Sequence, residues 1–177
     1  MQKKLSEAEF EKLFKELYTP LCRYCSRFVR STDLAEEIVQ ERFLFLWERK
    51  DSLKIRSSYK SFMFTAVRNK AIDYLRSRAA KLSLSQEELS HEIHDDTDPY
   101  KSMEYHEFEK EITGILESLP EKCYIIFSLK RFGGLENKEI ARKLKISEKT
   151  VLNQLTKAKK IVKAALSKYL NLVLLIF

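Results

Sequence analysis

The chain has 177 residues and a formal net charge of +7, with 33 Lys and Arg against 26 Asp and Glu. It contains only three Gly and three Pro, and its apolar residues recur at spacings of three and four, which predicts an all-α fold. The basic excess favours a polyanionic partner. Because no nucleophile–base pair, glycine-rich phosphate loop or carboxylate pair at catalytic spacing is found, we expect neither an enzyme nor a cofactor.

The composition predicts two small helical domains joined by a flexible acidic linker. Residues 6–80 form the first helical unit, with breaks expected at Thr19-Pro20, at residues 31–33 and at residues 51–58. Residues 81–107 mix Ser, acidic residues and a Pro with little apolar periodicity, as linkers do. Residues 108–170 form the second unit, and two domains on a tether fit better than one globule.

Residues 171–177 form an apolar tail. Its uninterrupted apolar run, Leu172–Phe177, is far shorter than the roughly 20 residues needed to span a bilayer. We therefore expect no stable membrane insertion. The tail is predicted to pack on its own domain or on a partner, and an interfacial anchor is the lesser alternative, because the large polar face of such anchors is missing.

Residues 36–48 concentrate acid and the only tryptophan of this basic chain in one helical stretch. At 100° per residue, one face is apolar and is expected to be core. Its members are Ala35, Val39, Phe43 and Leu46, with Ile38 and Trp47 at the edges. The opposite sector holds Glu37, Glu41, Leu44 and Glu48, flanked by Gln40 and Phe45. An apolar centre with a charged rim suits a protein partner, and the carboxylates would repel phosphate.

Residues 58–81 predict a second two-faced helix. Its inner stripe is formed by Phe64, Val67, Ala71, Tyr74 and Leu75. Its outer face carries Phe62, Thr65, Asn69, Asp73 and Arg76, with Arg78 and Lys81 close behind. An exposed aromatic ring beside amide and guanidinium groups can bind unstacked nucleic-acid bases. The residues leave open whether Phe62 serves in this way or is buried by the preceding loop.

Residues 137–165 carry the pattern of a helix-turn-helix. A short helix over 137–144 is followed by the turn Lys145-Ile146-Ser147 and a longer helix, whose first turn the Ser147 hydroxyl can cap. The stripe that must pack inward consists of Val151, Leu155, Ala158, Val162 and Ala165. The second helix is thereby oriented with one face free.

That free face bears only cations and hydrogen-bonding groups: Lys149, Asn153, Thr156, Lys157 and Lys160. Such a face suits a DNA major groove, where cations meet phosphates and amides read base edges. Asn153 and Gln154 are the candidate base readers, and Lys149, Lys157 and Lys160 the candidate phosphate contacts. A merely solvated lysine-rich face is the alternative, but the turn, the cap and the segregation of acids favour DNA.

Three segments in this order resemble a bacterial RNA polymerase sigma factor of the sigma-70 family, extracytoplasmic-function (ECF) group. "AEEIVQERFLFLWE" resembles the segment that grips the clamp helices of RNA polymerase. "SFMFTAVRNKAIDYLRSR" resembles the promoter-melting and minus-ten helix. "LPEKCYIIFSLKRFGGLENKEIARKLKISEKTVLNQLTKAKK" resembles the minus-thirty-five domain. The resemblance covers nearly the whole chain.

The resemblance implies a transcription initiation factor that binds core RNA polymerase and directs it to promoter DNA. It also implies a stress- or envelope-responsive regulon and an anti-sigma factor as a partner. The residues implied to bind polymerase are Glu37, Gln40, Glu41, Leu44 and Glu48. Those for the minus-ten element are Phe62, Asn69, Asp73, Arg76 and Arg78, with the loop 51–58 helping to capture an extruded base. Those for the minus-thirty-five element are Lys149, Thr150, Asn153, Gln154, Lys157 and Lys160.

Four positions depart from the family pattern. Glu37 stands where Asp is usual, and Phe45 stands where a polar or basic residue is common. Lys145 occupies a turn position that often carries Gly, and Leu152 one that is often polar. The last difference leaves open which promoter bases are read.

Two other hypotheses compete with this one. Cys22 and Cys25 form a CxxC pair, and His91 and His94 an HxxH pair, which together could suggest zinc or redox chemistry. Neither pair has a glycine-containing knuckle, and we expect no metal. The nearer rival is a stand-alone helix-turn-helix regulator whose residues 1–80 sense a ligand or form a dimer.

The odd number of cysteines and a start without an apolar secretory core predict a reducing, cytoplasmic location.

Overall fold

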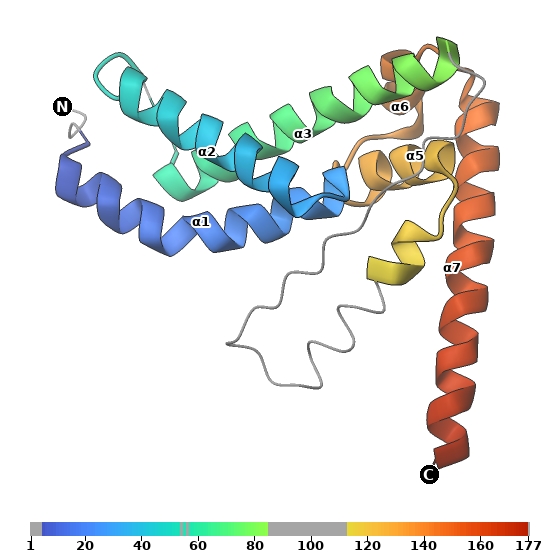
Figure 1. The fold of residues 1–177 in the computed structure, drawn as a ribbon. Coiled ribbons are helices and arrows are strands. Elements are labelled where there is room, and N and C mark those ends of the chain that lie inside the picture. Colours follow the sequence, from blue (N-terminus) through green and yellow to red (C-terminus); the bar gives the residue numbers. More distant parts are fainter. Residues whose placement is uncertain (1–4, 54, 56, 85–112, 177) are drawn as a thin grey trace. The chain divides into compact units, whose positions relative to one another are not determined.

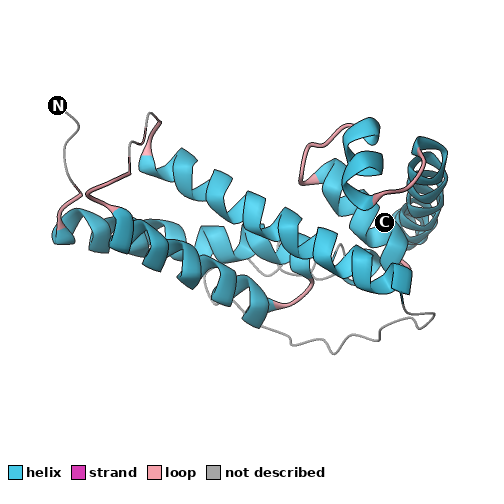
Figure 2. Ribbon diagram, turned by 90° about the horizontal axis from the view of Figure 1, so that it is seen from above, coloured by secondary structure: helices cyan, strands magenta, loops and turns pink. Residues whose placement is uncertain are grey.

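The computed structural model describes residues 5–53, 55, 57–84 and 113–176 (Figure 1). Every regular element among these residues is a helix (Figure 2), so the predicted all-α fold is confirmed. The chain divides into two compact units, Met1–Ser77 and Arg78–Phe177. The predicted flexible acidic linker lies outside the described residues, apart from 81–84, which belong to a helix.

The first unit is built from α1 (Glu7–Val29), α2 (Thr32–Arg49) and the larger part of α3 (Tyr59–Leu84). Ser6 starts α1, since its Oγ accepts from the Glu9 amide at 3.3 Å while its own amide donates to the Glu9 carboxylate at 3.0 Å. The helix ends at Arg30, which has a φ of 56°. Ser31 then caps α2, accepting from the Leu34 amide at 3.2 Å. The break expected at residues 31–33 is thus confirmed.

The break expected at Thr19-Pro20 is wrong, because α1 runs continuously through Pro20. A proline inside a helix removes one backbone hydrogen bond and crowds the preceding turn. The carbonyl that loses its partner is that of Glu16, and because Glu16 is exposed, water can solvate it. The buried residues Leu17 and Leu21 on either side hold the helix together by packing.

Aromatic contacts join α1 to the core face of α2. Phe43 is 2% exposed, and its ring lies 4.8 Å from that of Phe14 and 6.0 Å from that of Phe10. Phe10 also lies 4.9 Å from Trp47. The predicted core face of α2, Ala35, Val39, Phe43 and Leu46, is buried, and so is Ile38 at one edge, whereas Trp47 at the other edge is half-buried. The rotation of α2 about its axis is therefore fixed by packing.

The inner side of α3 is wider than a single stripe. Val67, Ala71 and Leu75 are buried as predicted, whereas Phe64 and Tyr74 are only half-buried. Phe64 instead meets Tyr24 of α1 edge to face, with ring centroids 5.3 Å apart. Met63, which the projection did not place inside, is fully buried.

In the second unit, residues 113–117 are helical, and α5 (Glu121–Arg131), α6 (Asn137–Leu144) and α7 (Glu148–Ile176) follow. Both α5 and α6 pack on α7. Their core includes Leu129, Ile140, Val151 and Ala158, each 0% exposed. None of the helices among the described residues combines the length and apolar content that a membrane span requires. The side chains of the apolar tail lie outside the described set.

The predicted helix-turn-helix is confirmed, with α6 and α7 separated by residues 145–147. Ser147 Oγ accepts from the Thr150 amide at 3.0 Å, so the predicted cap is formed. Lys145 ends α6 in the left-handed region, with a φ of 56°. A side chain in that conformation costs about 1 kcal/mol relative to glycine, and the packing of Ile140 and Val151 outweighs it.

Gly133 is required where the chain leaves α5. A Cβ atom at this position would lie 2.5 Å from the backbone oxygen of Leu129, which cannot swing away. Gly114 offers a matched control, since a Cβ atom there would meet nothing within 4 Å.

We expect Gly133→Ala to destabilise the second unit by about 1–3 kcal/mol, because the backbone must shift to relieve the overlap. Amide hydrogen exchange in α5 and α7 should therefore be at least about fivefold faster in this variant than in wild type. In Gly114→Ala, exchange in α5 and α7 should be unchanged or slower than in wild type, because alanine favours the helix at residues 113–117. Equal exchange rates in the two variants would contradict this assignment.

Candidate protein and nucleic-acid interfaces

The outward face of α2 presents the residues predicted to meet a protein. Leu44 is 57% exposed, although the helix buries its apolar residues on the other side. The exposed polar residues around it are Glu37, Gln40, Glu41 and Glu48. We call these five residues the acidic patch. An exposed leucine within a ring of carboxylates is the arrangement that projection of the sequence predicted.

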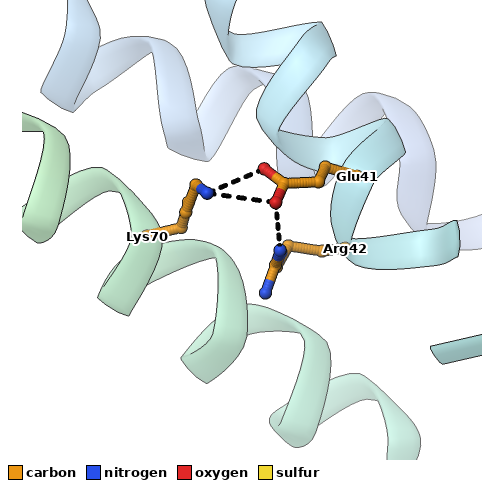
Figure 3. Close-up of polar contacts among 3 residues, drawn as sticks. All are labelled: Glu41, Arg42 and Lys70. Carbon is orange, nitrogen blue, oxygen red and sulfur yellow. Dashed lines mark hydrogen bonds and ion pairs between the residues drawn. The ribbon is translucent and has the colours of Figure 1, made fainter. Parts of the chain in front are cut away.

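Glu41 is held by two cations (Figure 3). Lys70 of α3 places its Nζ 3.0 Å from each carboxylate oxygen, and Arg42 Nη2 lies 2.6 Å from Oε1. The hydrogen bond from Lys70, with a further contribution from the Arg42 charge, lowers the pKa of the Glu41 carboxyl. The Glu41 side chain is 45% exposed, so water screens the pair and its contribution to stability is small. The pair fixes the direction of the carboxylate.

Two further contacts shape the rim of the acidic patch. Gln40 Nε2 donates to the Tyr18 hydroxyl at 3.0 Å, and Tyr18 stacks on Phe14 with ring centroids 4.9 Å apart. Phe45 lies between two guanidinium groups, with Arg42 5.3 Å and Arg49 5.8 Å from its ring centroid. Sequence reasoning missed Tyr18, Phe14 and Lys70 because projection of one helix carries no information about α1 and α3.

The outer face of α3 brings together four of the five residues predicted for the minus-ten element. Asn69, Asp73 and Arg76 are exposed, and Arg76 Nη2 lies 3.3 Å from Asp73 Oδ1. Phe62 is half-buried, between the two alternatives that the sequence left open. Arg78 differs from this group. It falls in the second unit, is 8% exposed and places its Nε 2.7 Å from Glu121 Oε1.

The first turns of α7 present the residues predicted for the minus-thirty-five element. Lys149, Asn153, Lys157 and Lys160 are exposed. Thr150 is half-buried, and its hydroxyl lies 2.8 Å from that of Ser147 in the helix cap. Gln154 is held away from this face, because its Oε1 accepts from Cys123 Sγ of α5 at 2.8 Å.

Models of two sigma-70 regions match the chain: "Sigma-70 region 2" over residues 13–81 and "Sigma-70, region 4" over residues 109–162. The chain belongs to the sigma-70 family. It is an ECF-type sigma factor, a non-enzymatic initiation factor that binds RNA polymerase and directs it to promoters. Because region 2 occupies the first unit, that unit is not the ligand-sensing or dimer-forming domain of a stand-alone regulator.

Similar proteins agree with this assignment. The sigma factor is 27% identical to a "Probable RNA polymerase sigma factor" of Haemophilus influenzae, covering 88% of this chain and 89% of the relative. It is 28% identical to "RNA polymerase sigma factor SigZ" of Bacillus subtilis, over 77% of this chain and 75% of that one. Among solved structures, Bartonella quintana RpoE in complex with the anti-sigma factor NepR has a TM-score of 0.51. At 18% identity it covers 90% of this chain and 97% of that chain, and it supports the fold.

The cysteines of the sigma factor lie in packed surroundings. Burial raises the pKa of the Cys25 thiol to about 12, with a smaller effect of Cys22. Burial, helped by Glu36, raises the pKa of Cys22 to about 11. Both thiols are therefore protonated at neutral pH, unlike the thiolates of redox sites. The described part of the chain contains no cluster of three or more metal-ligating side chains, and His91 and His94 lie outside it.

We expect Lys70→Met to raise the pKa of the Glu41 carboxyl toward its ordinary value, because the cation that lowers it most is removed. A carboxyl group whose pKa is lowered by folding stabilises the folded state at any pH above the ordinary pKa of that group. This stabilisation is lost as the pH falls through the lowered pKa. An NMR titration of the Glu41 carboxyl carbon measures the change. Arg76→Met is the control and should leave Glu41 unaffected, and a Glu41 titration identical in wild type and Lys70→Met would contradict the pair.

Proposed function

We propose that the sigma factor meets polymerase and promoter DNA through surfaces of opposite charge. The acidic patch on α2 binds core polymerase, the outer face of α3 holds the minus-ten element, and the first turns of α7 enter the minus-thirty-five major groove. The single observation that carries this proposal is Leu44, which is 57% exposed among carboxylates. DNA would be repelled by that surface, so its partner is a protein.

The acidic patch has the composition of a docking site for a basic partner helix. Burying an exposed leucine contributes about 1.5–3 kcal/mol, which is enough to make Leu44 its energetic centre. Glu37 and Glu48 supply charge at the rim. Glu41 is already bridged to Lys70 and Arg42, so a cation of the partner shares or replaces one of them.

The outer face of α3 is suited to single-stranded DNA. Asn69 and Asp73 can hydrogen-bond the edges of an extruded base, and Arg76 can neutralise a phosphate. Phe62, half-buried at the same face, offers a ring edge for stacking. The loop at 51–58 precedes this face along the chain, and residues 54 and 56 of that loop lie outside the described residues. Arg78, paired with Glu121, is not part of the proposed contact set.

The first turns of α7 supply amide and ammonium groups for duplex DNA. Asn153 is the proposed base reader, while Lys149, Lys157 and Lys160 contact phosphates. Thr150 supports the cap of the helix. Gln154 is left out of the reading set, because Cys123 holds its amide against α5.

The setting in which the sigma factor works is also proposed. We propose that it works in the cytoplasm, where polymerase and promoter DNA are found, and that it serves a stress- or envelope-responsive regulon, as its group suggests. The RpoE structure contains the anti-sigma factor NepR. By analogy, we propose that an anti-sigma factor holds this chain inactive by covering its polymerase-binding surface.

Leu44→Asp should abolish capture of core polymerase in a DNA-free binding assay, because it places a charge at the apolar centre of the acidic patch. The matched control is Leu152→Asp, since Leu152 is similarly exposed, at 51% against 57%, but lies in the other unit. The control should bind core polymerase as wild type does. Equal polymerase binding by wild type and Leu44→Asp would rule out the acidic patch as the surface that binds core polymerase.

Asn153→Ala should change which promoters are preferred, because it removes a base contact. Lys157→Ala should weaken all promoters evenly and lower the salt slope of binding by about one, because it removes a phosphate contact. Competition between promoter variants for reconstituted polymerase, repeated at several salt concentrations, separates the two. Unchanged promoter preference in Asn153→Ala would exclude that residue from base reading.

A further inference from the structure

Leu152 is a large apolar side chain on a surface that otherwise carries mostly cations, amides and hydroxyls, with the carboxylate of Glu148 at its N-terminal edge. It is 51% exposed, whereas its neighbours Val151 and Leu155 are 0% and 8% exposed. It lies just after the first turn of α7, which begins at Glu148. The core of the second unit therefore leaves this side chain at the end of α7 that faces a major groove in helix-turn-helix proteins.

A hydrogen bond makes the surface one turn after Leu152 less polar. Thr156 Oγ1 donates to the Leu152 carbonyl at 2.9 Å, so the hydroxyl is turned back onto the helix. Leu152 and Thr156 then form a narrow apolar strip. On the helical projection Lys149 and, further round, Asn153 lie on one side of it and Glu148 on the other, and all three are exposed.

We infer that Leu152 determines promoter specificity by packing on the 5-methyl group of a thymine in the major groove. This inference rests on the proposed function of α7 as the minus-thirty-five reader. Thymine is the one base that presents a methyl group in that groove. A leucine side chain cannot satisfy the hydrogen-bonding groups of other base edges, so burying one of those edges against it leaves polar groups unpaired.

The surroundings of Leu152 favour DNA over a protein as its partner. Leu44, the comparable exposed leucine of the first unit, lies among Glu37, Glu41 and Glu48. Leu152 has one carboxylate nearby, the exposed Glu148 one turn before it, but the exposed side chains that otherwise surround and follow it are Lys149, Asn153, Lys159 and Lys160. Those cations attract phosphates to either side and bring the apolar strip to the floor of the groove.

The test replaces single thymines by uracil, which differs only in lacking the methyl group. The full chain is reconstituted with core polymerase on a promoter defined by start-site mapping. Each thymine of the upstream element, on both strands, is replaced in turn, and affinity is measured by competition. We expect the affinity of wild type to fall about three- to fivefold when one or two particular thymines are replaced, which is the effect of losing one buried methyl group.

Variants assign that loss to Leu152. Leu152→Ala should bind thymine and uracil templates equally at those positions, and Leu152→Met should restore the discrimination. Lys159→Ala should weaken both templates equally and keep their ratio.

Either of two results would overturn the inference alone. One is promoter-specific transcription that no uracil substitution weakens, which leaves the proposed function standing. The other is discrimination that survives in Leu152→Ala. Absence of promoter-specific transcription by wild type would overturn the proposed function together with the inference.

Discussion

The packing of Phe43 against α1 determines which way α2 faces. Its ring is 2% exposed and is contacted by the rings of Phe10, Phe14 and Tyr18. A helix that buries one stripe has its opposite side free, so the burial of Phe43 and Leu46 turns Leu44 and its carboxylates outward. The same constraint acts in the second unit, where Val151 and Ala158 turn Asn153 and the lysines of α7 outward. The positions of both surfaces thus follow from core packing.

This explains how much of the structure the sequence could predict. Apolar residues at helical spacing indicate the core side of a helix, so the four central core residues of α2, the helix-turn-helix, and Val151, Leu155 and Ala158 in α7 were predicted correctly. Val162 and Ala165, predicted to lie on the same inward stripe of α7, are only half-buried. The break predicted at Thr19-Pro20 is wrong, because a proline in an exposed turn of a long packed helix is tolerated. Met63 was missed because α3 buries a wider arc than one stripe. Helical projection of one segment cannot show such a tertiary environment.

The candidate surfaces were predictable to the same extent. The acidic patch and the basic face of α7 each lie on one helix, so helical projection of the sequence was enough to predict them. The side chains that contact these surfaces from neighbouring helices could not be found in this way. Lys70 pairs with Glu41, Tyr18 accepts a hydrogen bond from Gln40, and Cys123 donates one to Gln154. We propose different partners for the two exposed leucines, because the charges around them differ. Carboxylates around Leu44 suit a basic protein, whereas lysines near Leu152 suit DNA.

The central claim is that this chain alone gives core polymerase its promoter specificity, through one protein-binding and two DNA-binding surfaces. In vitro transcription with purified core polymerase and genomic templates, followed by mapping of start sites, tests it most directly. The account predicts transcripts that require the chain and share two upstream sequence elements at a constant separation. Start sites that are unchanged when the chain is omitted, or that share no upstream element, would contradict it.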